Sequence, residues 1–160
     1  MKADRDLRRL TNGIVSSGNA LVREAGRLFR PHGLSAVQFN VLHLLVDAPG
    51  GLRPSALTAA LVVDASSTTY VLDRMEAAGW LRRRDDAHDR RASRIVLTPE
   101  GRRKHAAVAP LYAAALRETL SGLDPEKIAP LADALGEIQR AAHAGVSRVL
   151  HAAPRRKPPR

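Results

Sequence analysis

The sequence predicts a mainly α-helical protein that carries one small β-hairpin. Apolar residues recur at three- and four-residue steps over residues 5–30 and again over residues 128–149, which is the spacing of one face of a helix. Two short extended runs, residues 81–84 and 93–97, flank a polar loop and predict the hairpin. The chain has 160 residues, of which 44% are hydrophobic and 26% charged, a composition that indicates one globular domain or one domain with appended arms.

Local residue patterns predict where the first three helices begin and end. The first helix ends at Pro31-His32-Gly33. Ser35 and Gln38 have the spacing of a capping box, so a largely apolar second helix is expected to begin there and to run to about Asp47. A short third helix follows, because Pro54 stands where a first helical residue is expected.

The remaining helices are predicted from similar local signals. Asp64 is expected to cap a fourth helix that reaches Ala78, and Gly79 is suited to end it. Thr98-Pro99-Glu100 and Asp124-Pro125-Glu126 each combine a capping residue, a proline at the first helical position and an acid in the first turn. These two patterns predict a fifth helix after the hairpin and a sixth helix in the C-terminal part of the chain.

The order of elements over residues 34–110 predicts a winged helix-turn-helix domain. In such a domain the second helix of the pair enters the major groove of duplex DNA. The polar side of that helix is predicted to contact DNA through Ser66, Ser67, Thr69, Tyr70 and Arg74. Because residues 64–81 are net acidic, the electrostatic attraction to DNA must come from other parts of the chain.

The hairpin is the first candidate for that attraction. The whole chain has a net charge of +10, which favours a polyanionic partner, and residues 82–94 hold six arginines against three aspartates. Arg90 and Arg91 at the hairpin tip are placed to reach the narrow minor groove, and Asp89 is expected to pair with an arginine and to fix the shape of the loop. The alternative is a solvated Arg/Asp turn that makes only weak ion pairs.

The ends of the chain carry two further signals. Ile128, Leu131, Leu135 and Ile138 form an apolar seam along the last predicted helix. This seam packs either against a helix of a partner chain or against residues 5–30 of the same chain. The basic, proline-rich tail over residues 154–160 is predicted to be disordered, and it serves either phosphate contacts or solubility.

Several classes of function are excluded by what the sequence lacks. It has no cysteine, and therefore no disulfide, no cysteine zinc site and no thiol nucleophile. It has no glycine-rich phosphate loop and no His-Glu-x-x-His pair, and Ser66 and Ser67 lack a base evident in the sequence. We therefore expect no catalytic residue, no metal and no cofactor. Without a signal peptide or a membrane-spanning apolar run, the protein is expected to be cytoplasmic and to make no membrane contact.

Four motifs stand close together in the middle of the chain: Asp73-Arg74-Met75-Glu76, Gly79-Trp80-Leu81, Asp86-Ala87-His88-Asp89-Arg90-Arg91-Ala92 and Ile95-Val96-Leu97-Thr98-Pro99-Glu100-Gly101. Through these motifs the sequence resembles the multiple-antibiotic-resistance-regulator (MarR) family of transcription factors. The resemblance covers nearly the whole chain and is strongest over residues 34–101. Three positions depart from the family pattern: Val62 stands where a glycine is common in the turn, Tyr70 replaces a more usual basic residue, and Pro130 lies inside the last predicted helix and should bend it.

The resemblance implies a homodimer that binds a palindromic double-stranded operator. It implies that residues 1–33 and 111–153 form the dimerisation region and that residues 34–110 bind DNA, with half-sites about 10 bp apart. It places Arg91 in the minor groove, makes Arg90 a phosphate contact and makes Asp89 a structural partner within the wing. It also implies repression that a small ligand relieves.

A small aromatic or phenolic effector is the ligand class that the resemblance suggests. The effector pocket of the family lies between the dimer region and the DNA-binding lobe, where Phe29, Phe39 and His43 would line it. Each of these residues is equally well explained as part of the core. Two alternatives to a ligand-responsive repressor stay open: a constitutive DNA-binding or architectural protein without an effector, and a helical enzyme or scaffold that reuses the fold.

Overall fold

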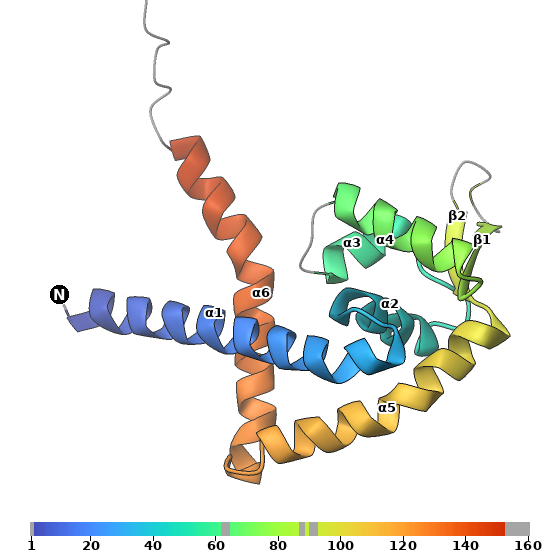
Figure 1. The fold of residues 1–160 in the computed structure, drawn as a ribbon. Helices are drawn as coiled ribbons and strands as arrows, with labels where there is room; N and C mark the ends of the chain where they lie inside the picture. Colours follow the sequence, from blue (N-terminus) through green and yellow to red (C-terminus); the bar gives the residue numbers. More distant parts are fainter. Residues whose placement is uncertain (1, 62–64, 87–88, 90–92, 153–160) are drawn as a thin grey trace, which may run out of the picture. The chain divides into compact units, whose positions relative to one another are not determined.

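The computed structural model describes residues 2–61, 65–86, 89 and 93–152, apart from some side chains near the end of the last helix. The chain divides into two compact units, residues 1–115 and 116–160. The first unit holds α1 (Lys2–Phe29), the short 3-10 helix η1 (Arg30–His32), α2 (Ala36–Val46), α3 (Pro54–Ala60), α4 (Ala65–Ala77), β1 (Leu81–Asp85), β2 (Ser93–Leu97) and most of α5 (Pro99–Thr119) (Figure 1). The second unit holds the end of α5 and α6 (Pro125–Ala152). Within the described residues, no helix is long and apolar enough to cross a membrane.

The predicted caps at the helix starts are present. The Ser35 side chain accepts a hydrogen bond from the Gln38 backbone N–H, and the Gln38 side chain accepts one from the Ser35 backbone N–H, so the capping box at the start of α2 is complete. Thr98 Oγ1 accepts from the Gly101 N–H at 3.0 Å at the start of α5, and Asp124 Oδ1 accepts from the Glu126 N–H at 3.0 Å before α6. These short-range contacts satisfy backbone donors that the first helical turn leaves without partners. The predicted cap at Asp64 and the departure at Val62 lie outside the described residues.

Gly79 makes the turn from α4 into the hairpin. Its φ is +74°, a left-handed conformation that favours glycine. The Gly79 N–H donates to the carbonyl of Glu76 at 2.9 Å, and the Trp80 N–H donates to the carbonyl of Met75 at 3.0 Å. The glycine thus closes the helix with the hydrogen-bond pattern of a Schellman cap and directs the chain into β1.

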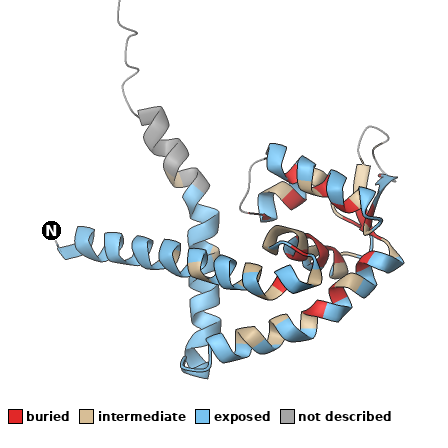
Figure 2. Ribbon diagram, viewed as in Figure 1, coloured by how far each residue is buried: buried red, intermediate tan, exposed pale blue. Residues whose placement is uncertain are grey.

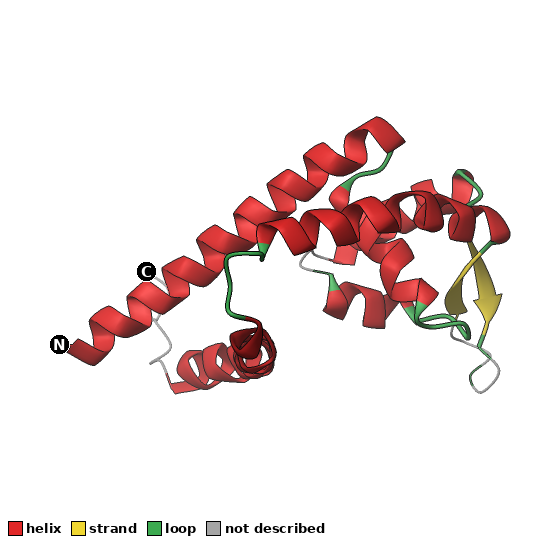
Figure 3. Ribbon diagram, turned by 90° about the horizontal axis from the view of Figure 1, so that it is seen from below, coloured by secondary structure: helices red, strands yellow, loops and turns green. Residues whose placement is uncertain are grey.

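The predicted hairpin forms as two antiparallel strands (Figure 3). Leu81 pairs with Leu97 and Asp85 with Ser93, so β1 extends one residue beyond the predicted strand. One pairing was not predicted: the N–H and carbonyl groups of Leu52 and Ile95 exchange hydrogen bonds of 3.1 and 2.8 Å. A single bridging residue has no periodicity that a sequence pattern could reveal.

The core of the first unit lies where α2, α4 and the hairpin meet. Buried residues gather on these elements (Figure 2). Phe39, Leu42 and Met75 are fully buried. On α4, Thr68, Leu72 and Met75 form the buried stripe, because their three- and four-residue spacing places them on one face of the helix. The opposite side of α4 is thereby left to solvent.

The apolar residues of α1 and α6 are mostly exposed. Along α1, only the last turn is buried, at Phe29 (Figure 2). Exposed large apolar side chains are Leu7, Leu10, Val15, Leu21 and Val22 on α1, Leu111 on α5, Leu120 and Leu123 after it, and Ile128, Leu131, Leu135 and Ile138 on α6. Exposed large apolar side chains that recur along one helix mark a surface that contacts a partner.

Candidate DNA-binding surface

The solvent-facing side of α4 holds all five residues that the sequence predicts for the major groove. Ser66, Ser67, Thr69, Tyr70 and Arg74 are exposed. At 100° per residue they occupy one arc of the helix, opposite the buried stripe of Thr68, Leu72 and Met75. The face carries hydroxyl groups and one guanidinium, which are groups that bond base edges and phosphates.

Tyr70 and Arg74 contact each other on this face. Arg74 Nη1 donates a hydrogen bond to the Tyr70 hydroxyl at 3.1 Å. The Arg74 guanidinium carbon also lies 5.7 Å from the centroid of the Tyr70 ring. The pair is separated by four residues, so one turn of the helix brings the two side chains together.

Arg83 connects the side of α4 to strand β1. Its guanidinium donates to Asp73 Oδ1 at 2.6 Å and also to Glu76, and its backbone N–H donates to Glu76 Oε1 at 2.9 Å. The hydrogen bond to Asp73 raises the pKa of Arg83 above its ordinary value, and the charges of Glu76 and Asp73 add to this. Arg83 therefore stays positively charged and joins β1 to two carboxylates of α4.

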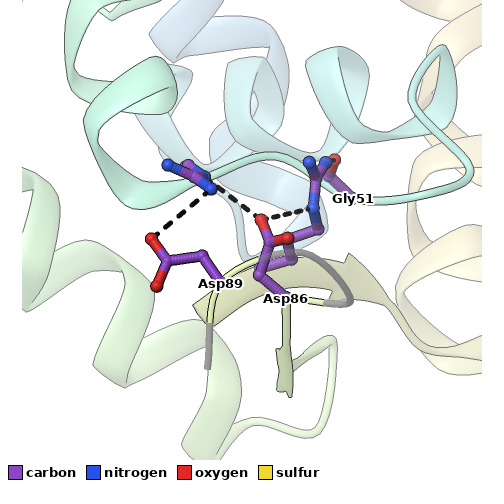
Figure 4. Close-up of polar contacts among 5 residues, drawn as sticks. Gly51, Asp86 and Asp89 are labelled. Atoms are coloured by element: carbon purple, nitrogen blue, oxygen red, sulfur yellow. Dashed lines mark hydrogen bonds and ion pairs between the residues drawn. The ribbon is translucent and has the colours of Figure 1, made fainter. Parts of the chain in front are cut away.

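Asp86 connects the base of the hairpin loop to the segment before α3. Its Oδ2 accepts hydrogen bonds from Arg53 Nε at 3.1 Å and from Arg94 Nε at 2.9 Å (Figure 4). Arg94 also donates to the carbonyl of Gly51 at 2.9 Å. The Asp86 side chain is fully buried, whereas both arginines are partly exposed. A buried carboxylate with two cationic donors is well compensated for its loss of water.

A glycine allows this segment to approach the hairpin. Gly51 has a φ of +79°, and a Cβ at this position would lie 2.5 Å from Val96 Cγ1 and 2.6 Å from the carbonyl oxygen of Ile95. Neither the conformation nor the space admits a side chain without a shift of the backbone. Gly51 therefore permits both the bridge between Leu52 and Ile95 and the hydrogen bond from Arg94 to the Gly51 carbonyl.

Three predicted pocket residues lie together in the first unit. The Phe29 and Phe39 rings stack with centroids 4.2 Å apart, and the Phe39 and His43 rings stack at 5.8 Å. Two residues of α5 join them: His105 Nε2 lies 3.1 Å from His43 Nδ1, and the Tyr112 ring meets Phe39 edge-on at 4.9 Å. Phe29 and Phe39 are buried core residues, whereas His43 is exposed.

The two imidazoles of this cluster influence each other. Burial lowers the pKa of His105, the neighbouring His43 lowers it further, and Asp47 opposes the shift. The described residues contain no group of three or more histidine, cysteine or acidic side chains placed to hold a metal ion. The histidine pair is therefore a hydrogen-bonded link between α2 and α5.

Comparison with known proteins places this arrangement in a family. Residues 32–92 match the sequence profile of the MarR family. The HTH-type transcriptional regulator PecS of Dickeya dadantii (strain 3937) is 34% identical over 134 residues, which cover 82% of this chain and 81% of PecS. The chain belongs to the MarR family. It is therefore a transcriptional regulator rather than an enzyme, as the sequence predicted.

Solved structures confirm the predicted MarR-type winged-helix fold. Sco3205, a MarR family transcriptional regulator of Streptomyces coelicolor solved in complex with DNA, is 26% identical and has a TM-score of 0.69, with 86% of each chain covered. CouR of Rhodococcus jostii RHA1, solved with bound p-coumaroyl-CoA, is 25% identical and has a TM-score of 0.73, with 79% of this chain and 88% of CouR covered.

Within this MarR-family fold, the predicted wing residues are placed only in part. Asp89 Oδ2 lies 3.8 Å from Arg53 Nη2, an ion pair longer than those of Asp86. Arg90 and Arg91 lie outside the described residues, so their predicted contacts with DNA stay predictions. Arg82 and Arg84 are exposed on β1, and no ion pair involves them within the described part of the chain.

Sequence reasoning missed the residues that join separate elements of this MarR-family regulator. Asp86 stands out in the sequence only as part of a family motif, and no sequence pattern singles out Arg53 or Arg94. The spacing of Asp73 and Glu76, three residues apart on one helix beside an arginine-rich strand, was an available signal for the Arg83 contact. Likewise His105 and Tyr112 stand seven residues apart, which places them on one face of α5.

Proposed function

We propose that this MarR-family regulator is a homodimer that binds a palindromic operator and represses transcription until a small aromatic ligand releases it. The observation that carries the proposal is the polar outer face of α4, which stands beside an arginine-rich hairpin and is fixed to it through Arg83. Sco3205, which shares the fold, was solved in complex with DNA. Binding to chromosomal DNA would place the protein in the cytoplasm.

The two parts of this surface have different tasks in the proposal. The α4 face enters the major groove, which is about 12 Å wide and admits a helix. There Ser66, Ser67, Thr69, Tyr70 and Arg74 meet base edges and nearby phosphates. The hairpin supplies the attraction through counterion release, with Arg82 and Arg84 as phosphate contacts beside the predicted Arg90 and Arg91. Asp86 and Asp89 set the position of this hairpin through Arg53.

Dimerisation is supported by the exposed apolar residues of α1, α5 and α6. The apolar seam of α6 (Ile128, Leu131, Leu135 and Ile138) is between 39% and 49% exposed along its length. Burial of a leucine side chain stabilises an interface by about 1.5–3 kcal/mol, so a second copy of the chain gains much by covering these residues. We accordingly assign residues 1–33 and 111–153 to the dimer region and residues 34–110 to DNA binding. The tail over residues 154–160 lies outside the described residues.

The effector is proposed to act beside the aromatic cluster, which consists of Phe29, Phe39, His43, His105 and Tyr112. CouR, which shares the fold, was solved with p-coumaroyl-CoA, a ligand with a phenolic ring. The exposed His43 offers the ligand a polar group, and the buried rings of Phe39 and Phe29 lie stacked behind it. A ligand releases the operator only if it binds one arrangement of the dimer more tightly than the DNA-binding one.

Selection of bound duplexes from a random library tests this function. The expected result is a palindrome with half-sites about 10 bp apart, bound by a protein that light scattering shows to be a dimer. Failure to enrich any motif, or a monomer bound to single half-sites, would contradict the proposal. Titration of the selected operator complex with phenolic carboxylates and their thioesters then tests the ligand class.

A further inference from the structure

The Tyr70–Arg74 pair holds a guanidinium in place on the outer face of α4. Tyr70 is 61% exposed, yet its hydroxyl accepts a hydrogen bond from Arg74 Nη1 at 3.1 Å. The guanidinium also lies 5.7 Å from the ring centroid. A free arginine side chain loses considerable rotamer freedom when it binds DNA. Because the two contacts with Tyr70 already order Arg74 in the unbound protein, this entropy cost of binding is smaller.

The charge of Arg74 remains available to another acceptor. The two acidic residues of α4, Asp73 and Glu76, are both held by Arg83 on the hairpin side of the helix. Among the described residues, no carboxylate forms an ion pair with Arg74. A guanidinium has five N–H donors, so the bond to Tyr70 leaves two adjacent donors for a bidentate contact.

The direction of the side chain favours a base over a phosphate. Side chains of an α-helix point toward its N-terminus, and the contact with Tyr70 draws the guanidinium one turn further in that direction. The N-terminal half of a recognition helix is the part that contacts base edges. In the major groove the commonest specific partner of an arginine is guanine, through O6 and N7.

We infer that Tyr70 is a positioning residue for operator specificity: it holds Arg74 in the orientation from which the guanidinium reads one guanine in each half-site. This inference rests on the proposed DNA-binding function. The operator must then contain a guanine at that position, and Tyr70 tunes the selection of this guanine through Arg74.

Duplex selection with the wild-type chain and its variants tests the inference. The wild-type chain is compared with Tyr70→Phe, which keeps the ring and removes the hydroxyl, and with Arg74→Lys, which keeps the charge and removes the paired guanidinium donors. Arg102→Lys, at an exposed arginine of α5, is the matched control outside α4. Thermal unfolding checks that all variants are folded.

The expected pattern is specific to one operator position. The wild-type chain selects a guanine at one position of each half-site. Arg74→Lys lowers that preference by about tenfold or more, the discrimination of a good bidentate contact. Tyr70→Phe lowers it several-fold at the same position. The slope of affinity against salt stays unchanged in both variants, because no phosphate contact is lost. The control Arg102→Lys keeps the wild-type motif.

The double variant separates positioning from direct contact. If Tyr70 acts through Arg74, Tyr70→Phe has no further effect on base preference in the Arg74→Lys background. An effect of Tyr70→Phe at a different operator position, or no effect at any position, overturns the inference while the proposed function stands. Unchanged base preference in Arg74→Lys, together with a salt slope lowered by about one in Arg74→Ala, assigns Arg74 to a phosphate and also overturns it. If the wild-type chain enriches no motif, the proposed function fails and this inference fails with it.

Discussion

The carboxylate of Asp86 accepts a hydrogen bond from Arg53 Nε at 3.1 Å across 33 residues of chain. This contact joins the loop of the hairpin to the residue that precedes α3. Because Arg94 of β2 donates to the same oxygen, three segments meet at one buried atom. The hairpin is thus held at a defined position beside the helix pair, which is what a protein needs in order to contact two grooves of DNA at once.

We expect Asp86→Asn to destabilise the fold by about 1–3 kcal/mol, because a buried amide cannot neutralise two guanidinium groups. Chemical denaturation measures this loss. Asp89→Asn is the matched control: the Asp89 side chain is 44% exposed, its ion pair with Arg53 is longer, and its loss is expected to stay within about 0.5 kcal/mol. Equal losses for the two variants would show that burial of Asp86 does not set the strength of its contacts.

Substitution of two neighbouring arginines of β1 is expected to affect different properties: stability for Arg83 and DNA affinity for Arg84. Arg83→Ala removes the contacts to Asp73 and Glu76, so it should lower the free energy of unfolding by about 1 kcal/mol or more. Arg84→Ala removes an exposed side chain, so it should leave unfolding unchanged while reducing DNA affinity and lowering the salt slope by about one. Denaturation and salt-dependent binding of both variants check this. A stable Arg83→Ala protein with a reduced salt slope would assign the phosphate contact to Arg83 instead.

The local elements could be predicted from the sequence, and the connections between them could not. Ser35, Gly79 and Thr98 act within a few residues of their own position, so their spacing alone indicates a cap or a turn. The exposed face of α4 follows from the same periodicity that buries Leu72 and Met75. In contrast, Asp86 finds Arg53 only after the chain has folded, and nothing in the spacing of the two residues distinguishes this pair from other pairs of opposite charge.

The His43–His105 pair predicts that stability depends on pH. The pKa of His105 is lowered in the folded chain below its ordinary value of 6.5, first by burial and then by His43. The unfolded chain therefore binds a proton more readily than the folded one between these two pKa values. The stabilising contribution is fully present above pH 6.5 and is lost as the pH falls through the folded pKa. Urea denaturation at pH 8 and at pH 5.5 should show a lower unfolding free energy at the acid pH.

The variant His105→Gln isolates this contribution, because glutamine keeps a hydrogen-bonding group beside His43 Nδ1 and does not titrate. The difference in stability between pH 8 and pH 5.5 should be smaller in the variant than in the wild-type chain. His32→Gln on η1, outside the aromatic cluster, serves as the control and should keep the wild-type difference. A wild-type difference preserved in His105→Gln would place the responsible proton elsewhere.

The apolar seam of α6 provides the most direct test of dimerisation. Leu131→Lys combined with Leu135→Lys places charges where the proposed interface must be dry, and both leucines are about half exposed in the single chain. Loss of about 1.5–3 kcal/mol for each buried leucine predicts that the dimer dissociates at least about a hundredfold more readily. Light scattering should then report a monomer, and affinity for the full palindrome should fall toward that for a single half-site. The exposed residues Ala129 and Ala141 of α6, which lie away from the seam, add the same two charges when both are changed to lysine, and this control protein should remain dimeric. If the protein remains dimeric after the leucine changes, the interface is formed by α1 and α5, and the seam of α6 contacts another partner.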